Sequence, residues 1–209
     1  MLEIRLLGQF DVRAHGDTPL VIPSRLLQSL LAYLLLNRAT AHRREKVAGL
    51  FWPETSETDA RRNLRQGLWR LRKALDASSP TFSDLLLSDD LSVGIDSQVA
   101  YSLDVTRLEE TRINLSTDDL MCALDVYQGE LLPDFYDEWV SLERERLHAL
   151  FEQQVERLLE QLCAEQRWDE TLRWAERWIA LGHSPEPAYR ALMIAHSARG
   201  NRSQVAEVF

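Results

Sequence analysis

The sequence predicts a mainly α-helical fold with a small β component, divided into a domain at residues 1–103 and an all-helical domain at 104–209. Short apolar clusters separated by turn residues mark the first part, whereas helical patterns fill the second. The charge divides in nearly the same place. Residues 1–100 contain 13 Lys and Arg against 12 Asp and Glu, and residues 101–209 contain 11 against 21. A near-neutral domain can bind a polyanion through a local basic surface, whereas a strongly acidic domain is better suited to protein partners.

The first domain should open with a small antiparallel sheet. Apolar residues cluster or alternate in Leu2–Leu7 and Phe10–Ala14, around Gly8. His15, Gly16 and Asp17 form a turn signal, and Leu20–Ile22 is the next strand candidate.

Three helices should follow. Pro23 and Ser24 open the first, which ends near Asn37. Its apolar stripe consists of Leu26, Leu27, Leu30, Leu31, Leu34 and Leu35. The second helix spans about Arg43–Trp52, with Val47, Leu50 and Phe51 facing inward and Pro53 beyond its end. The third can be capped by Ser56, with Asp59 in the capping-box position.

The third helix has an unusual charge pattern in its Ala60–Leu75 segment. It contains six basic residues and no acidic one, although the whole chain has a net charge of −9. At about 100° per residue, one stripe is apolar and should pack on a core. That stripe consists of Ala60, Leu64, Leu68, Leu71 and Leu75, widened by Gly67 and Ala74. The opposite face presents Arg62, Gln66, Trp69 and Lys73, flanked by Arg65 and Arg72 on one side and by Asn63 and Arg70 on the other.

Two interpretations of this helix remain open. An arginine-rich amphipathic helix is often only a solvated helix with an apolar seam. Solvated helices usually mix signs, however, and no acid lies between Asp59 and Asp76. Trp69 also lies on the face that should be wet, where a large aromatic side chain suggests a partner. Guanidinium and amide groups on a rigid helix suit recognition of phosphates and base edges.

A hairpin should follow the helices, from Leu85–Ser88 and Leu91–Ile95 joined by Asp89 and Asp90, with Ser97–Leu103 as a returning strand. Sheet, three helices and hairpin is the order of a winged helix-turn-helix. In that fold the third helix enters the DNA major groove and the hairpin is the wing. Topology and charge therefore select the same helix.

The second domain should be helical throughout. Helical patterns cover Leu120–Tyr127, about Asp137–Ala164, Asp169–Leu181, Pro187–Ala198 and a start at Arg202. Laying Thr171–Ala175 over Val205–Phe209 gives a period near 34, which matches tetratricopeptide spacing. The pattern stops in mid-helix, so we expect the natural polypeptide to continue beyond residue 209, with this domain truncated at its C-terminus.

Other classes of function have little support. No P-loop, HExxH or Gly-x-Ser-x-Gly pattern is present, and the five histidines form no close ligand pair, so we expect no catalytic site, metal or cofactor. Cys122 and Cys163 lie in apolar helical patterns without Cys or His companions, which predicts buried free thiols. The four tryptophans of the second domain are expected to pack between helices. No apolar run approaches the roughly 20 residues of a membrane span, and no signal sequence is evident, which predicts a cytoplasmic protein.

Several segments together resemble the SARP-type bacterial activators, in which an OmpR-type winged helix precedes a bacterial transcriptional activation domain of tetratricopeptide-like helices. The resemblance spans essentially the whole chain. It rests on LLAYLLLNR, VAGLFWPE, ARRNLRQGLWRLRKAL, VYQGELLPDFYDEWV and RALMIAHSARGNRSQVAEVF, with Gly129–Leu132, Trp139 and Glu143–Arg146 as its most specific part.

The resemblance implies a sequence-specific activator that binds direct repeats in double-stranded DNA near a promoter and recruits RNA polymerase. It places the recognition positions on Arg61, Arg62, Arg65, Gln66, Trp69, Arg70 and Lys73. It places a polymerase-contact turn on Pro53, Glu54, Thr55, Ser56 and Glu57. Larger members append further C-terminal domains. Trp69 departs from the smaller or polar residue expected there, so the base preference cannot be transferred.

Four alternatives stay open on the sequence. Trp69 can stack on a sugar or thymine methyl, or it can cap a neighbouring protomer. Arg43 and Arg44 can contact phosphate or be ordinary surface charges. The modest number of cations suggests that two copies bind together on DNA as a homodimer, and the protein off DNA can be a monomer that pairs only there. Finally, the chain can be a protein-interaction or scaffold module of a larger signalling ATPase, in which the winged helix does not read DNA.

Overall fold

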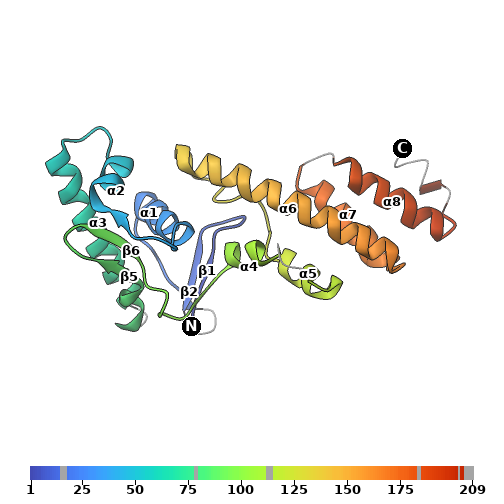
Figure 1. The fold of residues 1–209 in the computed structure, drawn as a ribbon, viewed down its shortest axis with the longest axis horizontal. Coiled ribbons are helices and arrows are strands. Elements are labelled where there is room, and N and C mark those ends of the chain that lie inside the picture. The colour runs from blue at the N-terminus through green and yellow to red at the C-terminus, as the bar shows by residue number, and fades with distance from the viewer. Residues whose placement is uncertain (15–17, 78–79, 112–114, 183–184, 202, 205–209) are drawn as a thin grey trace. The chain divides into compact units, whose positions relative to one another are not determined.

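The structure is a computed structural model that describes residues 1–14, 18–77, 80–111, 115–182, 185–201 and 203–204. It divides into two compact units, Met1–Leu103 (unit 1) and Asp104–Phe209 (unit 2). Figure 1 labels their helices and strands.

Unit 1 begins with a four-stranded sheet in the order β3-β2-β1-β7. Its strands are β1 (Leu2–Arg5), β2 (Asp11–Ala14), β3 (Thr18–Pro19) and β7 (Tyr101–Leu103). β1 pairs antiparallel with β2 and parallel with β7, so the last strand of unit 1 returns to its first. The predicted returning strand is therefore confirmed, in a shorter form. The turn predicted at residues 15–17 lies outside the described residues.

The third strand comes earlier than Leu20–Ile22, so that prediction is wrong in position. The Leu20 N–H still donates to the Val12 carbonyl at 2.8 Å. The Ile22 carbonyl instead accepts a hydrogen bond from the Gln28 side-chain amide at 3.1 Å. The chain at Ile22 is therefore bound to the helix that follows and not to the sheet.

The three helices of unit 1 are α1 (Arg25–Leu36), α2 (Arg44–Phe51) and α3 (Glu57–Asp76). Ser24 caps α1, and the Ser56 hydroxyl accepts from the Asp59 N–H at 3.2 Å, as predicted for α3. Leu26 and Leu50 were expected to face inward but are 39% and 40% exposed. Each lies at the edge of its apolar stripe, and in α2 the buried stripe is formed by Val47, Ala48 and Phe51.

A second sheet follows, in the order β4-β6-β5. Its strands are β4 (His42–Arg43), β5 (Leu86–Ser88) and β6 (Ser92–Ile95). The 3₁₀ helix η1 (Pro80–Leu85) leads into β5. β5 and β6 form the predicted antiparallel hairpin, and β4 adds a third strand beside β6. The hairpin is thus joined to the segment that immediately precedes α2.

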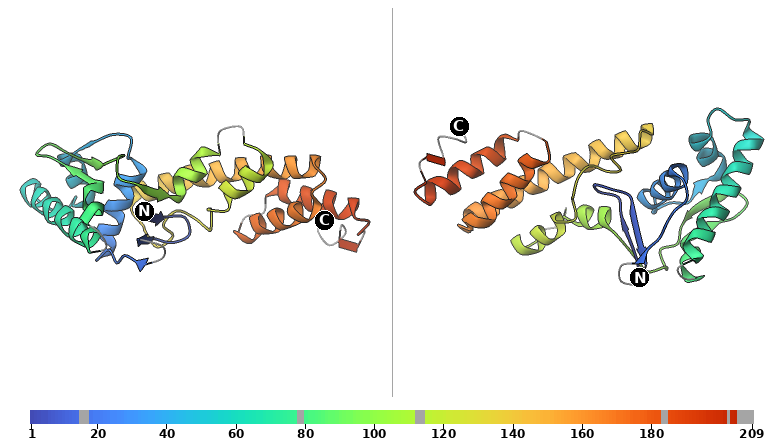
Figure 2. Two further views of the ribbon diagram at one scale, coloured as in Figure 1. Left: turned by 90° about the horizontal axis from the view of Figure 1, so that it is seen from below. Right: turned by 180° about the vertical axis from the view of Figure 1, so that it is seen from behind.

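Unit 2 contains α4 (Asp104–Glu110), α5 (Thr117–Leu124), α6 (Glu138–Ala164), α7 (Trp168–Ala180) and α8 (Glu186–Ala198). Figures 1 and 2 show α6, α7 and α8 packed side by side. Of the four tryptophans expected to pack between helices, Trp174 and Trp178 are buried, which confirms the prediction for them, whereas Trp139 and Trp168 are partly exposed. The segment Val205–Phe209, used for the repeat comparison, lies outside the described residues.

The loop between α5 and α6 is held by Arg144 of α6. Its guanidinium donates to the carbonyls of Leu131 at 3.0 Å, Leu132 at 2.8 Å and Phe135 at 3.1 Å. Within this loop Tyr127 stacks on Phe151 of α6, with ring centroids 4.0 Å apart. Burial raises the pKa of Tyr127, so its phenol stays neutral at physiological pH.

Both cysteines are free thiols, but the prediction that both are buried is wrong, since Cys122 is exposed on the short helix α5. Cys163 is half-buried, and that burial raises the pKa of its thiol. Within the described ranges, no helix combines the length and apolarity that crossing a bilayer requires.

Candidate nucleic-acid interface

Helix α3 is positioned by its apolar stripe. Ala60, Leu64, Gly67, Leu68, Leu71 and Leu75 are all buried, as predicted. Gly67 brings α3 close to α1, because a Cβ atom there would lie 3.2 Å from Leu27 Cδ2. The helix is therefore fixed against the core of unit 1 and turns its polar face outward.

The outward face carries the side chains predicted to read DNA. Arg62, Gln66, Trp69 and Lys73 are all exposed, and Trp69 is 60% exposed. Lys73 Nζ lies 5.3 Å from the centroid of the Trp69 ring, which is within range of a cation–π interaction. This interaction keeps a flat aromatic surface and a positive charge together on the outer face of α3.

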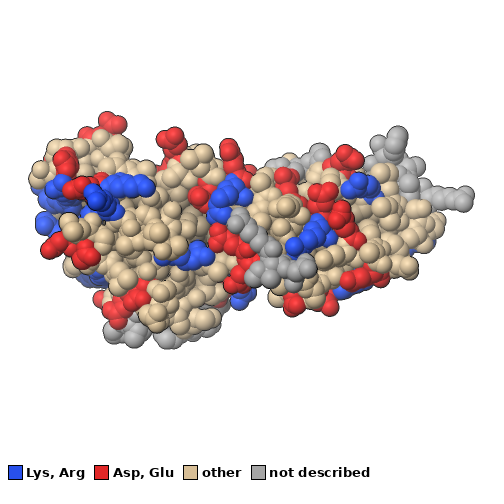
Figure 3. Space-filling view, viewed as in Figure 1, with Lys and Arg blue, Asp and Glu red and all other residues tan. Residues whose placement is uncertain are grey.

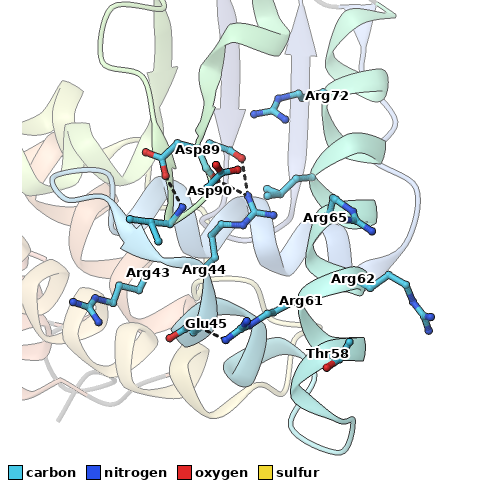
Figure 4. A pocket seen from close by; sticks show the side chains of 13 residues that line it. Arg43, Arg44, Glu45, Thr58, Arg61, Arg62, Arg65, Arg72, Asp89 and Asp90 are labelled. Carbon is cyan, nitrogen blue, oxygen red and sulfur yellow. Dashed lines mark hydrogen bonds and ion pairs between the residues drawn. The ribbon is translucent and has the colours of Figure 1, made fainter.

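A groove of about 920 Å³ runs between α3, the start of α2 and the β5–β6 hairpin. Figure 4 shows its lining side chains. The groove is lined by six arginines (Arg43, Arg44, Arg61, Arg62, Arg65 and Arg72), three acids (Glu45, Asp89 and Asp90) and Thr58, Leu68, Ser88 and Leu91. The excess of guanidinium groups makes it suitable for a polyanion.

Two of the predicted contacts are already engaged in ion pairs. Arg61 contacts Glu45 at 2.8 Å and also pairs with Glu57. Arg62 pairs with Asp59 at 2.8 Å. Figure 4 shows Arg61 directed toward Glu45. The basic face is therefore partly neutralised at its N-terminal end. The acids that pair with it come from the first turn of α3 and from α2.

The other basic side chains have fewer partners. Among the residues that the structure describes, no carboxylate forms an ion pair with Arg43, Arg65, Arg70 or Lys73. Arg43 and Arg65 combine this availability with a place in the groove lining. Of these two, Arg65 is the one on α3, the helix whose outward face was predicted to read DNA.

Arg44 and Arg72 hold the hairpin in place. The Arg44 guanidinium donates to Ser88 Oγ at 2.8 Å and to the Asp89 carbonyl at 3.3 Å. Arg72 donates to the Leu86 carbonyl at 2.9 Å. The structure therefore gives Arg44 more than an ordinary surface charge, since it fixes one wall of the groove.

The hairpin tip is organised by the Asp89 carboxylate. Asp89 Oδ1 accepts from the N–H groups of Leu91 at 2.8 Å and Ser92 at 2.7 Å, and Oδ2 accepts from the Ser92 hydroxyl at 2.8 Å. These hydrogen bonds, with a smaller contribution from Arg44, hold the pKa of Asp89 below its ordinary value of 3.8. The Asp89 carboxylate is therefore ionised at neutral pH, and Asp90 is a second acidic residue at the tip.

This depressed pKa predicts how the hairpin tip responds to acid. Because the ionised form is favoured in the folded tip, its contribution to stability is complete above the ordinary pKa and is lost as pH falls through the lower, folded-state pKa. We expect the amide NMR signals of Leu91 and Ser92 to titrate together, with a midpoint below pH 3.8. Asp89→Asn should remove this transition; its persistence in that variant would contradict the assignment to Asp89.

The predicted polymerase-contact turn lies on the surface between α2 and α3. Pro53, Glu54, Thr55, Ser56 and Glu57 are all exposed. Thr55 closes the turn through a hydrogen bond from its hydroxyl to the Trp52 carbonyl at 3.0 Å. Ser56 is also the cap of α3, and Glu57 is already its first residue. The turn is therefore a short ordered segment available to a protein partner.

Sequence reasoning missed the roles of Glu45 and Arg72 at this site. The sequence does predict one ion pair at this site, that of Glu57 with Arg61, because the two residues have the i,i+4 spacing of a helical ion pair. The contacts Glu45–Arg61 and Arg72–Leu86 join different elements and have no such local signal.

The charged side chains are distributed differently on the two units. On unit 1, Lys and Arg gather over α2 and α3 in the view of Figure 3, with acidic side chains beside them. On unit 2, acidic and basic side chains are interspersed in the same view. A basic helix beside a hairpin is an arrangement that nucleic-acid-binding helix-turn-helix domains use.

The family model described as bacterial transcriptional activator domain matches residues 86–209, and the chain belongs to this family. This is the helical domain expected from the resemblance of the sequence to SARP-type bacterial activators. The family match begins in β5 and so includes the hairpin and β7 as well as unit 2.

The fold is also similar to that of a solved structure, EmbR from Mycobacterium tuberculosis in complex with a low-affinity phosphopeptide. The TM-score is 0.76 at 19% sequence identity, and the similarity covers 99% of this chain and 57% of the EmbR chain. This confirms the predicted fold class, a winged helix followed by a helical domain. No curated protein matches the sequence.

Proposed function

We propose that this chain is a sequence-specific DNA-binding activator that binds direct repeats near a promoter and recruits RNA polymerase. The observation that carries the proposal is the exposed basic face of α3 beside an arginine-lined groove. A rigid helix with guanidinium and amide groups is suited to the major groove, where these groups pair with base edges.

The contacts divide into two kinds. Gln66, Trp69, Arg70 and Lys73 on the outward side of α3 face the bases, with the Trp69 ring against a sugar or a thymine methyl group. Arg65 and Arg43 line the groove, where a phosphate backbone can run. Arg61 and Arg62 contribute less, since each is already paired.

The hairpin has an unusual composition for a segment beside DNA. Leu86–Ile95 contains no Lys or Arg, and its tip carries Asp89 and Asp90. The cation that the hairpin side of the groove offers to a phosphate is therefore Arg44, which donates to Ser88 Oγ and to the Asp89 carbonyl. We expect phosphate contact from Arg44 and no insertion of the acidic tip into a minor groove.

Binding to direct repeats follows from the small number of available cations. Few phosphate contacts give weak binding by one copy, and affinity rises when two copies bind adjacent half-sites. The exposed Pro53–Glu57 turn is the proposed contact with polymerase, and the acidic unit 2 supplies a surface for protein partners.

The experiment is selection of duplexes from a random pool with the 209-residue chain, followed by sequencing and repeated at two salt concentrations. Recovery of a repeated motif that Arg62→Ala/Arg65→Ala no longer selects would support the DNA reader. Transcription from a promoter carrying that motif, with Glu54→Ala as the turn variant, then tests polymerase recruitment.

A protein-interaction module is the second candidate, favoured by the acidic hairpin tip and its exposed Leu91. In that case a folded chain selects no motif, and the Arg62→Ala/Arg65→Ala variant behaves as the wild type does.

A further inference from the structure

We propose that Glu45 and Glu57 limit non-specific DNA binding by withholding Arg61 from phosphate, which makes them specificity-determining residues. This inference rests on the proposed function, because it concerns how the α3 face discriminates among duplexes.

The geometry places two carboxylates on one guanidinium. Glu45 comes from the first turn of α2 and contacts Arg61 Nη2 at 2.8 Å, and Glu57, four residues before Arg61 in α3, pairs with the same nitrogen. Glu45 and Arg61 both line the groove between α3 and the hairpin. Figure 4 shows the Glu45–Arg61 contact at its edge. The cluster therefore has a net charge of −1 at a place where phosphate would approach.

The stability of unit 1 does not require this cluster. The side chains of Glu45, Arg61 and Glu57 are 62%, 52% and 73% exposed. Exposed ion pairs contribute little to stability because water and salt screen them. The main effect of these three charged side chains is therefore on the binding of a charged molecule in the groove.

The cluster also divides α3 along its length. Its first turns carry Glu57 and Asp59 against Arg61 and Arg62, whereas the part beyond Arg62 carries Arg65, Arg70, Arg72 and Lys73 with no acid before Asp76. The positive potential is therefore displaced toward the middle and C-terminal part of α3. Fewer phosphate contacts, which do not depend on the DNA sequence, can then form at the N-terminal end of α3. Discrimination among DNA sequences therefore depends more on base contacts from the middle of the helix.

The test compares the wild type with Glu45→Gln/Glu57→Gln, using the selected duplex and a random-sequence duplex over a range of salt concentrations. Releasing Arg61 adds one phosphate contact, so the slope of log K against log salt should steepen by about 0.9. Affinity for the random duplex should rise about two- to fivefold, the factor that corresponds to an exposed ion pair. The ratio of specific to random binding should fall.

Two further variants isolate the cause. Adding Arg61→Ala to the double variant should abolish the gain. Asp76→Asn/Asp84→Asn changes the net charge by the same amount at exposed acids away from Arg61, and should leave the slope unchanged. Thermal unfolding confirms that each variant is folded.

An equal gain in the Asp76→Asn/Asp84→Asn control, a gain that survives Arg61→Ala, or weaker binding of both duplexes would overturn the inference. These outcomes differ from failure of the proposed function, in which the wild type shows no preference for any duplex and Arg65→Ala has no effect.

Discussion

Replacing Arg65 with alanine is expected to weaken binding to the selected duplex by about 1–3 kcal/mol, or roughly 5- to 150-fold. Arg65 is exposed, lines the groove, and has no ion pair among the described residues. Its guanidinium therefore reaches DNA without first breaking a protein contact. Fluorescence anisotropy with a labelled duplex measures the change.

The nature of the Arg65 contact can be resolved by comparing duplexes. A phosphate contact predicts an equal loss on selected and random duplexes and a salt slope shallower by about 0.9. A base contact predicts a loss confined to the selected duplex, with relaxed preference at one position. Arg65→Lys keeps the charge but loses the bidentate geometry, so it should rescue only the phosphate contact.

A matched control is Arg5→Ala, which removes an exposed arginine from β1 outside the groove. Arg61→Ala is a second comparison, and its effect should be smaller because Arg61 is already paired. If Arg65→Ala binds as tightly as Arg5→Ala, α3 does not contact DNA through this residue.

Much of unit 1 is encoded in local patterns. The 3.6-residue repeat of α3 placed Leu64, Leu68 and Leu71 in the core and Trp69 on the surface, and the structure confirms both. Ser56 and Asp59 predicted the start of α3 for a local reason, since a capping box needs only residues three apart.

Two kinds of feature could not be predicted from the sequence. They are contacts between residues far apart in the chain, and the burial of residues at the edge of an apolar stripe. Arg44 contacts Ser88 across 44 positions, and Arg144 reaches three carbonyls in the preceding loop. Such contacts depend on side-chain conformations that periodicity does not specify. Leu50 shows the other limit, because a hydrophobic residue at the edge of a stripe is only partly covered.

Arg144→Ala is expected to destabilise unit 2 by about 3 kcal/mol, because three carbonyls would lose a charged donor. Leu131, Leu132 and Phe135 are themselves buried, so little water can replace the guanidinium. Leu132 also has a φ of 45°, a left-handed conformation that is costly for a side chain other than glycine. One of the three Arg144 hydrogen bonds goes to the carbonyl of this residue, so its loss should also release the strained conformation.

Denaturant unfolding followed by tryptophan fluorescence measures this effect, since four of the six tryptophans lie in residues 104–209. Arg144→Lys should restore little, because one ammonium group cannot reproduce the spaced donors of the guanidinium. Arg199→Ala is the control: it removes a 2.6 Å pair with the 84% exposed Asp169 side chain, and should cost less than about 1 kcal/mol. An equal, small effect of both alanine variants would mean that the loop between α5 and α6 keeps its conformation without Arg144.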